Sequence, residues 1–462
     1  MMSMSLKLYN TKTGNKESFK PINPDSLTMY LCGPTVYDYA HIGNARPAVV
    51  FDVLYRLLKH YYPKVTYARN ITDIDDKINK SALELGVNIK NYSAKYAKIY
   101  NQDIEQLGVL APDIEPYATQ HIPQIISMIK NLIDKGHAYA AEGHVLFAVE
   151  SYDNYGRLSN RKIEDMIAGA RVEVAPYKKH PADFVLWKPS DETLPGWNSP
   201  WGRGRPGWHI ECSAMCKAHL GDVIDIHCGG RDLVFPHHEN EAAQSCCAND
   251  TESFANYWVH NGMINMGQQK MSKSLGNILL IKDVAAQYKG EVIRWLLLSA
   301  QYRQSVAWSE DSIHKAQKTL DRIYATLRDN QAITANVNKE NIPAGVLKAL
   351  DDDLNTPIAF AEINKIAKQL AKSESLEDKT LFKSQLLSTG ELLGFFLEGA
   401  ETWFKSIDSN IDSDKIDALI VQRDQARLDK DWAKSDQIRD KLADMNITLE
   451  DSAQGTRWSV KK

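Results

Sequence analysis

The chain has 462 residues, more than one ordinary domain holds, so we expect about three or four structural units. Hydrophobic residues make up 43% and charged residues 25%, which excludes a disordered chain. With 55 Lys and Arg against 59 Asp and Glu the net charge is −4, so a nucleic-acid partner has to be met by local basic patches. No apolar run reaches the roughly 20 residues of a membrane span, and Met1–Asn10 lacks the apolar core of a signal peptide. The six cysteines include no C-x-x-C pair, so we expect a reducing, cytoplasmic location without a membrane partner.

The first predicted unit combines strands and a helix. Residues 27–32 (LTMYLC) form an apolar run that ends at a Gly-Pro turn, which indicates a buried strand. A loop follows, then a helical pattern over 46–60 and a second strand-like run over 65–69. This order predicts an α/β fold with a Rossmann-type parallel sheet and a nucleotide site at the carboxyl ends of its strands. The glycine-rich dinucleotide fingerprint is absent, so the phosphate loop is of another kind.

The pattern then changes twice along the chain. Between about 116 and 205, the strand-like runs 144–149 and 184–188 are separated by Pro and Gly, which indicates an insertion in the sheet domain. The sheet pattern returns at 223–228 and leads into a helix near Pro236. From about 311 the chain is helical in pattern, apart from a tail rich in Thr, Ser and Gly over 448–459.

The loop after the first strand can bind an anion. It contains His41, Gly43 and Asn44 directly before a helix, where unpaired N–H groups and the helix dipole favour negative charge. A histidine beside a glycine that admits a nucleotide suits ATP phosphates. An isolated H-x-G also fits a tight turn with a surface histidine, so the spacing alone leaves both readings open.

A second loop, KMSKSLGN over 270–277, carries Lys270 and Lys273. Two lysines on a flexible loop can close on a triphosphate as pyrophosphate leaves, although a solvated basic loop has the same composition. Together, HIGN and KMSKS resemble the paired signature of class I aminoacyl-tRNA synthetases. The resemblance implies that His41 and Asn44 contact ATP phosphates, that Lys273 is the mobile catalytic lysine, and that Asp232 in GRD holds the ATP ribose. Because an amino-acid carboxylate is already ionised, its attack on ATP needs positioning and Mg²⁺ carried by ATP rather than a general base.

A third group of residues offers metal ligands. Cys32 ends the first strand, Cys212 lies in GWHIECSAM, and His237 and Glu241 are four apart on one face of a predicted helix. Two thiolates, an imidazole and a carboxylate suit zinc. Other metal-binding side chains stand close by in the sequence, and local spacing does not reject them: His227, Cys228, His238 and Glu239.

Four strings resemble the bacterial type of the cysteinyl-tRNA synthetase family: CGPTVYDYAHIGNAR, RNITDIDDKI, GWHIECSAM and FPHHENE. The resemblance implies one Zn²⁺ per chain, held by Cys32, Cys212, His237 and Glu241, and a cysteine pocket lined by Thr72 and Trp208. It also implies a monomer that forms cysteinyl-adenylate from L-cysteine and ATP and transfers cysteine to the 3′-terminal adenosine of tRNA(Cys). Separating cysteine from serine by about 10⁴ takes about 5.5 kcal/mol, which direct binding of the thiolate to a soft metal can supply.

The C-terminal tail carries candidate RNA contacts. By spacing, four basic residues share one helix face, and two tryptophans can stack on bases: Arg423, Arg427, Lys430, Lys434, Trp432 and Trp458. Acids interleave with them, so a solvated, salt-bridged face is an alternative. The strings KDWAKSDQIRD and GTRW resemble the family's anticodon-binding module, and DDDLNTP over 351–357 resembles a structural stretch of its helical domain.

The resemblance divides the chain into five parts. A split catalytic domain covers 1–115 and 206–262, a connective insertion covers 116–205, and the KMSKS and stem-contact region covers 263–320. A helical bundle follows over 321–405, and the anticodon-binding module covers 406–462.

Three other functions compete with tRNA charging. A ligase that joins cysteine to a small amino sugar would share the zinc and ATP sites but has no use for the tail after about residue 406. A zinc hydrolase built on His237 and Glu241 leaves Lys270 and Lys273 without a purpose. An RNA-binding paralogue without catalysis is disfavoured by the intact lysines and His41.

Overall fold

The computed structural model describes residues 6–163, 175–267, 269–270, 278–405, 413–452 and 455–460. At its centre lies the parallel sheet that the sequence predicts, with strand order β10-β9-β3-β4. These strands are short and almost wholly buried, as expected for a sheet covered on both faces. Their bounds are β3 Leu27–Leu31, β4 Val65–Arg69, β9 Ile224–Gly230 and β10 Ala255–Asn261.

Helix α1 (Ile42–Tyr61) follows β3 and packs against the sheet through residues such as Val49 and Val53. It begins four residues before the predicted start at Arg46. Gly43 and Asn44 are weak helix formers, which moved the predicted boundary. In the structure the Asn44 side chain stabilises that first turn, because its Oδ1 accepts a hydrogen bond from the His41 backbone N–H at 3.1 Å.

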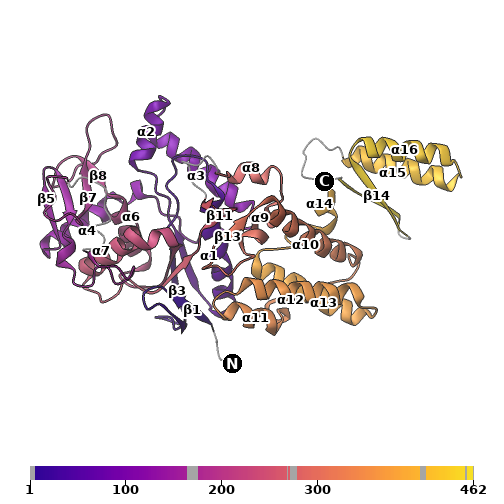
Figure 1. The fold of residues 1–462 in the computed structure, drawn as a ribbon, viewed down its shortest axis with the longest axis horizontal. Coiled ribbons are helices and arrows are strands. Elements are labelled where there is room, and N and C mark those ends of the chain that lie inside the picture. The colour runs from indigo at the N-terminus through magenta and orange to yellow at the C-terminus, as the bar shows by residue number, and fades with distance from the viewer. Residues whose placement is uncertain are drawn as a thin grey trace.

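Most of the chain between β4 and β9, from α4 to α6, builds a second layer at the left of Figure 1, while α2 and α3 lie above the central sheet in that view. An antiparallel sheet in the order β5-β6-β7-β8 packs with α4 and with residues of α6 and α7 around the buried Trp187. The insertion therefore rests on α6 and α7, the two helices that also approach the parallel sheet. The bounds here are α2 Asp76–Glu84, α3 Ile89–Glu105, η1 Ala118–Gln120, α4 Ile122–Asp134, β5 Ala138–Ala141, β6 His144–Phe147, η2 Val149–Ser151, β7 Phe184–Pro189, β8 Gly204–Pro206, α6 Trp208–Leu220, η3 Arg231–Leu233, η4 Val234–His238 and α7 Glu239–Asn249.

After β10, a small sheet in the order β12-β11-β13 leads into helices, as the helical pattern predicts. Helices α11, α12 and α13 lie together on the lower right of Figure 1, beside α10. The bounds are β11 Ile264–Met266, β12 Gln269–Lys270, α8 Ile281–Ala285, α9 Gly290–Leu297, β13 Val306–Trp308, α10 Glu310–Asp329, η6 Lys339–Asn341, α11 Ala344–Asp351, α12 Thr356–Lys372, α13 Leu376–Leu393 and α14 Ala400–Lys405. At the N-terminus, β1 (Lys7–Asn10) and β2 (Asn15–Ser18) form a hairpin.

The C-terminal module stands apart at the right of Figure 1. Helices α15 (Ser413–Leu428) and α16 (Trp432–Asp444) pack on a hairpin of β14 (Ile447–Ser452) and β15 (Gly455–Val460). The polar tail over 448–459 is thus a β-hairpin, anchored by Ile447 and Trp458 in a separate small core with both helices. Within the described ranges, no helix combines the length and apolar character needed to cross a membrane.

Candidate functional site

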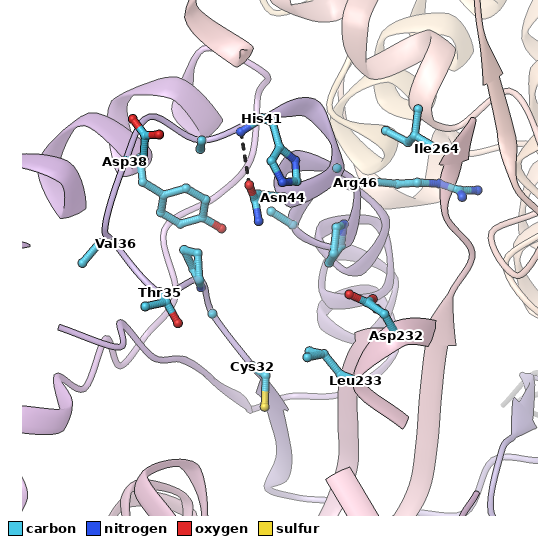
Figure 2. Close-up of a pocket in the computed structure, with 18 of the residues that line it drawn as sticks. Cys32, Thr35, Val36, Asp38, His41, Asn44, Arg46, Asp232, Leu233 and Ile264 are labelled. Carbon is cyan, nitrogen blue, oxygen red and sulfur yellow. Dashed lines mark hydrogen bonds between the residues drawn. The ribbon is translucent and has the colours of Figure 1, made fainter. Parts of the chain in front are cut away.

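A cavity of about 700 Å³ opens at the carboxyl ends of β3, β9 and β10 (Figure 2), where ligands bind in open parallel sheets. The first turn of α1 forms one wall, the chain after β9 and β10 forms another, and Trp208 and Lys77 reach in from α6 and α2. The predicted residues that line this cavity are Cys32, His41, Gly43, Asn44, Trp208 and Asp232.

The backbone at the cavity's entrance is held closely. Gly33 lies so near β4 that a Cβ atom there would come within 1.6 Å of the Asn70 carbonyl oxygen, so only glycine fits. The Gly33 N–H donates to Asn70 Oδ1 at 2.9 Å. Near the end of β9, a Cβ on Gly230 would meet Asp232 Oδ1 at 2.4 Å, which places that carboxylate directly over the glycine. The two glycines therefore let the ends of β3 and β9 pack closely against Asn70 and Asp232.

The second lysine loop is only partly within the described residues. Lys270 pairs with Asn265 across β12 and β11, which fixes where the loop begins. Lys273, with the rest of the predicted loop over 271–277, lies outside the described residues.

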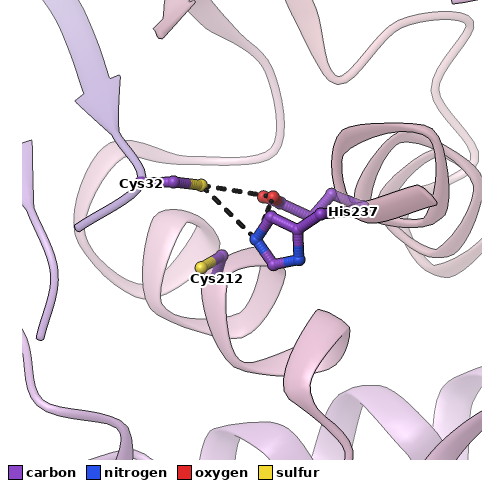
Figure 3. A group of neighbouring side chains, drawn as sticks. Cys32, Cys212 and His237 are labelled. Carbon is purple, nitrogen blue, oxygen red and sulfur yellow. Dashed lines mark hydrogen bonds and ion pairs between the residues drawn. The ribbon is translucent and has the colours of Figure 1, made fainter. Parts of the chain in front are cut away.

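The four predicted zinc ligands come together beside the cavity. Figure 3 shows Cys32, Cys212 and His237 pointing toward one another from the end of β3, from α6 and from the start of the segment that becomes α7. With Glu241 they form a group of buried donors whose ligand atoms all lie within 4.8 Å of one another. Cys32 Sγ lies 3.6 Å from His237 Nε2 and 3.3 Å from Glu241 Oε1, and the last two atoms are 2.9 Å apart.

These separations fit a tetrahedral metal. Usual zinc bond lengths put a sulfur and a nitrogen ligand about 3.6 Å apart, and a nitrogen and an oxygen about 3.4 Å apart. The Cys32–His237 separation of 3.6 Å matches the first value. The His237–Glu241 separation of 2.9 Å is shorter because the two groups form an ion pair directly. Small movements would therefore complete the coordination of an ion.

The pKa shifts show how the four donors share charge with one another. A hydrogen bond with Cys32 lowers the pKa of Cys212 to about 6, while burial raises the pKa of Cys32 well above its ordinary value. Burial opposes ionisation of Glu241, but His227 and His237 hold its pKa well below the usual range. Burial also disfavours the charged form of His237, yet Glu241 raises its pKa to about 10. Three acidic donors thus lie together in a buried site, where a dication can neutralise them.

Of the alternative metal-binding side chains that the sequence offered, the structure removes Cys228 and Glu239 from the metal group. Side chains alternate across β9, so Cys228 faces the apolar core beneath α1 and not the donor group. Glu239 accepts backbone N–H groups of Gly156 and Ser159 at 2.9 and 2.7 Å, so it anchors the insertion.

His227 and His238 remain as alternatives. With Cys32 and Glu241 they form a second group of donors within the same 4.8 Å limit. His227 Nε2 lies 2.9 Å from Glu241 Oε2, whereas His238 Nδ1 is hydrogen-bonded to His260 Nε2 at 2.7 Å. Glu241 and Cys32 are therefore shared by two overlapping candidate metal sites.

A supporting layer surrounds the donors, and two of its residues, His209 and Asn70, were not among the predicted site residues. His209 Nδ1 lies 2.9 Å from His237 Nδ1, and burial together with His237 lowers the pKa of His209 to about 3. His209 is thus neutral. When His237 binds a metal through Nε2, its Nδ1–H can donate a hydrogen bond to His209. Trp208, 38% exposed, stacks on the His237 ring with centroids 4.2 Å apart. Asn70 joins this layer, because it contacts Cys212 Sγ at 3.8 Å and donates to Thr72 Oγ1 at 3.3 Å.

The predicted RNA contacts of the C-terminal module separate into two groups. Arg423 is buried and makes a bidentate pair with Asp451, both bonds at 2.9 Å. Trp458 is only 3% exposed and donates from Nε1 to Asp417 at 2.7 Å. Trp432 is 61% exposed, and Lys430 and Lys434 lie near it on the surface. Arg427, also partly exposed, pairs with Asp451 at 2.7 Å.

Comparison with known proteins agrees with this architecture. Residues 18–318 match the family described as "tRNA synthetases class I (C) catalytic domain", and residues 345–398 match the DALR domain. Among solved structures, a methionyl-tRNA synthetase of Mycobacterium tuberculosis with methionyl-adenylate has a TM-score of 0.56 at 14% identity, covering 82% of this chain and 93% of its own. A leucyl-tRNA synthetase complex of Agrobacterium radiobacter K84 reaches 0.57 at 12% identity, covering 83% and 85%. The fold is that of the class I aminoacyl-tRNA synthetases.

More similar relatives narrow the class to one family. Residues 413–458 match the "Cysteinyl-tRNA ligase anticodon binding domain". The cysteine–tRNA ligase of Parvibaculum lavamentivorans is 55% identical over 99% of this chain and 98% of its own length. That of Xanthomonas campestris pv. campestris is 56% identical over 99% of both chains. The chain belongs to the cysteine–tRNA ligase family.

Proposed function

We propose that the chain joins L-cysteine to tRNA(Cys) at the expense of ATP, with the reaction centre in the cavity above β3, β9 and β10. The convergence of Cys32, Cys212, His237 and Glu241 beside that cavity carries the proposal. In the first step the cysteine carboxylate attacks the α-phosphorus of ATP, forming cysteinyl-adenylate and releasing pyrophosphate. In the second, a hydroxyl of the 3′-terminal adenosine takes the cysteinyl group and AMP leaves.

The walls of the cavity fit ATP. The first turn of α1 offers its N–H groups and positive dipole end to the phosphates, with His41 and Gly43 beside them. Asn44 keeps this turn in shape through its bond to the His41 N–H. Asp232, above Gly230, accepts hydrogen bonds from the ribose hydroxyls. Lys270 and Lys273, with Mg²⁺ carried by ATP, neutralise the charge that develops on the departing pyrophosphate.

We assign the metal to Zn²⁺, one per chain, held by Cys32, Cys212, His237 and Glu241. This set is preferred to the one with His227 and His238 because it contains two thiols, and because Trp208, which lines the cavity, stacks on the His237 ring. Bound there, zinc supplies a soft Lewis acid that prefers the thiolate of cysteine to the hydroxyl of serine. His209 fixes the tautomer of His237, and Trp208 and Thr72 close the pocket around the substrate.

The C-terminal module is proposed to contact tRNA through its exposed residues. Trp432 can stack on an unpaired base, and Arg427, Lys430 and Lys434 supply positive charge beside it. Arg423 and Trp458 keep the module folded from within, through Asp451 and Asp417. A module of this kind has no use in a ligase that acts on a small amino sugar, and the matched catalytic domain disfavours both the zinc hydrolase and the non-catalytic paralogue.

We further propose that the protein works as a monomer in the cytoplasm. All six cysteines are buried free thiols, and two of them are candidate metal ligands that a reducing compartment would protect. Light scattering coupled to size exclusion checks the oligomeric state.

Cysteine-dependent ATP–pyrophosphate exchange tests the function, with serine as the control substrate and metal-depleted protein alongside. Exchange with cysteine, none with serine, and loss on metal removal are expected. Transfer to tRNA transcripts, with a small amino sugar as the competing acceptor, then identifies the acceptor. Absence of exchange by folded, metal-loaded protein refutes the catalytic proposal, and exchange that survives metal removal refutes the role given to zinc.

A further inference from the structure

Asp353, at the start of the helical domain, accepts side-chain or backbone hydrogen bonds from four different residues. It is buried and has a positive φ of 62°. Its Oδ1 accepts the Tyr302 hydroxyl and the Tyr9 backbone N–H, each at 2.8 Å. Its Oδ2 accepts Arg303 Nε at 2.9 Å and Gln301 Nε2 at 3.2 Å. Three of these four partners lie in the single turn formed by residues 301–304, so one carboxylate fixes the shape of that turn.

The turn formed by residues 301–304 also binds a buried arginine of α1 through its backbone carbonyls. Arg46 donates from Nη1 to the Met263 carbonyl at 2.7 Å, and from Nη2 to the carbonyls of Tyr302 and Gln304 at 3.3 and 2.5 Å. The same turn contacts the chain after β10, because the Gly262 N–H donates to the Tyr302 carbonyl at 2.8 Å. A Cβ on Gly262 would come within 2.5 Å of the Gln304 carbonyl oxygen, so the backbone at Gly262 packs directly against the turn.

The two groups that the turn holds, Arg46 and Gly262, and Met263, which Arg46 holds, all belong to the cavity. Arg46, Gly262 and Met263 line it, and Figure 2 shows Arg46 extending from α1, two residues after Asn44, toward the strand that carries Ile264. Met263 leads into β11, and β11 pairs with β12, where the lysine loop begins. Directly after the turn, β13 pairs with β11 in parallel. A displacement of the turn would therefore move one wall of the cavity and the base of the lysine loop together.

We propose that Asp353 is a positioning residue for ATP: it fixes the turn 301–304 and, through the turn, Arg46 and the Gly262–Ile264 wall. This rests on the assignment of the cavity to ATP made above. The DDDLNTP stretch then does more than shape the helical domain, because it connects that domain to the nucleotide site. The four proposed zinc ligands lie at the end of β3, on α6, in η4 and on α7. None of the hydrogen bonds described for the turn reaches these elements, so the effect is expected to be specific to ATP.

The substitution Asp353→Asn tests this proposal. Asparagine keeps the size of the side chain and tolerates a positive φ, but it removes the charge and turns one acceptor into a donor that opposes Arg303 and Gln301. The expected result in pyrophosphate exchange is a KM for ATP raised about tenfold, below the roughly 100-fold that a 1 Å misplacement can cost. The KM for cysteine and the zinc content stay within a factor of two.

Asp352→Asn is the matched control, because the neighbouring carboxylate is exposed and pairs only at the surface, with Lys16 at 2.6 Å. It leaves both KM values unchanged. An Asp353→Asn protein with unchanged KM for ATP, or with both KM values raised alike, or with only a lower active fraction, overturns the inference. Should that variant fail to fold, Tyr302→Phe decides: a KM for ATP raised about threefold or more, the order of effect of one lost hydrogen bond, supports the inference, and no change overturns it.

Asn44→Ala in the same assay separates the two proposals. A raised KM for ATP in Asn44→Ala with none in Asp353→Asn leaves the ATP cavity in place and removes only the role of Asp353. An unchanged KM for ATP in Asn44→Ala contradicts the assignment of the cavity itself.

Discussion

Replacing Cys212 with serine removes one of the four proposed zinc ligands while keeping the shape of the side chain. A hydroxyl does not ionise near neutral pH, whereas a hydrogen bond with Cys32 lowers the pKa of the Cys212 thiol to about 6. Loss of an outer-shell partner of a metal ligand typically weakens metal affinity 10–100-fold, so loss of a direct ligand should cost at least the upper value. About 100-fold corresponds to about 2.7 kcal/mol.

Three measurements read out this loss. The affinity for zinc, measured by competition with a chelator, should fall by about two orders of magnitude. At saturating zinc, the metal stabilises the wild-type fold more than the variant by about the same 2.7 kcal/mol, visible as a smaller zinc-dependent rise in Tm. Discrimination between cysteine and serine in pyrophosphate exchange should collapse, because the substrate thiolate no longer meets a correctly held ion.

Cys216→Ser is the control, since Cys216 lies one turn later on α6, is equally buried, and belongs to neither group of metal donors. This variant also buries a hydroxyl in α6, so it should show the cost of that change alone and keep its zinc. If Cys212→Ser keeps its zinc and its selectivity while His238→Asn loses both, the metal lies among Cys32, His227, His238 and Glu241, and the proposed ligand set is wrong.

Three further predictions concern other parts of the molecule. Trp208→Ala removes the ring stacked on His237, so the KM for cysteine should rise about 3–10-fold with zinc content unchanged. Trp432→Ala should raise the KM for tRNA about tenfold at unchanged Tm. Arg423→Ala, which removes a buried arginine and its bidentate pair with Asp451, should instead lower the unfolding temperature of the C-terminal module. The opposite pattern would contradict the division into exposed and internal residues. Burial raises the pKa of Asp103 to about 6, so its folded form resists ionisation and its contribution to stability falls as the pH rises from about 4 to 6. Asp103→Asn should therefore raise Tm by about 2 °C at pH 7.5 and by nothing at pH 4, in thermal unfolding at both pH values.

Much of the central fold is written locally in the sequence. The runs 27–32 and 65–69 are mostly apolar and bounded by turns, and both are strands in the structure, the second with the predicted bounds. The start of α1 was misplaced, because it depends on a side-chain bond between Asn44 and the His41 backbone rather than on intrinsic helix preference. Such capping depends on a geometry that residue types alone do not fix.

The metal group shows where local reasoning stops. Periodicity predicted that His237 and Glu241 share a face, but Cys32 and Cys212 join them only because β3 and α6 meet beyond the sheet. The choice between His227 and Cys228 needed the pleat of β9, which sends adjacent side chains to opposite faces. Without the strand's bounds and the sheet order, the sequence left both open.

The C-terminal module shows a different limit. Helical spacing put Arg423 on the same face as Arg427 and Lys430, and nothing in that pattern shows that a hairpin covers part of the face. The hairpin of β14 and β15 brings Asp451 onto Arg423 and buries Trp458 between the helices. A basic stripe with tryptophans is therefore ambiguous until the element that packs on it is known.

The position of the metal donors links selectivity to the architecture. Cys32, Cys212 and Glu241 are all acidic. Because they are buried side by side, ionising all three costs free energy unless a cation is present. They come from the sheet and from α6 and α7, and those two helices also carry the insertion. An ion bound there would tie the sheet to both helices with the same bonds that hold it ready for a thiolate. Loss of metal should therefore weaken the junction between the sheet and the insertion as well as cysteine binding, which is why the zinc-dependent rise in Tm and the selectivity of Cys212→Ser are expected to fall together.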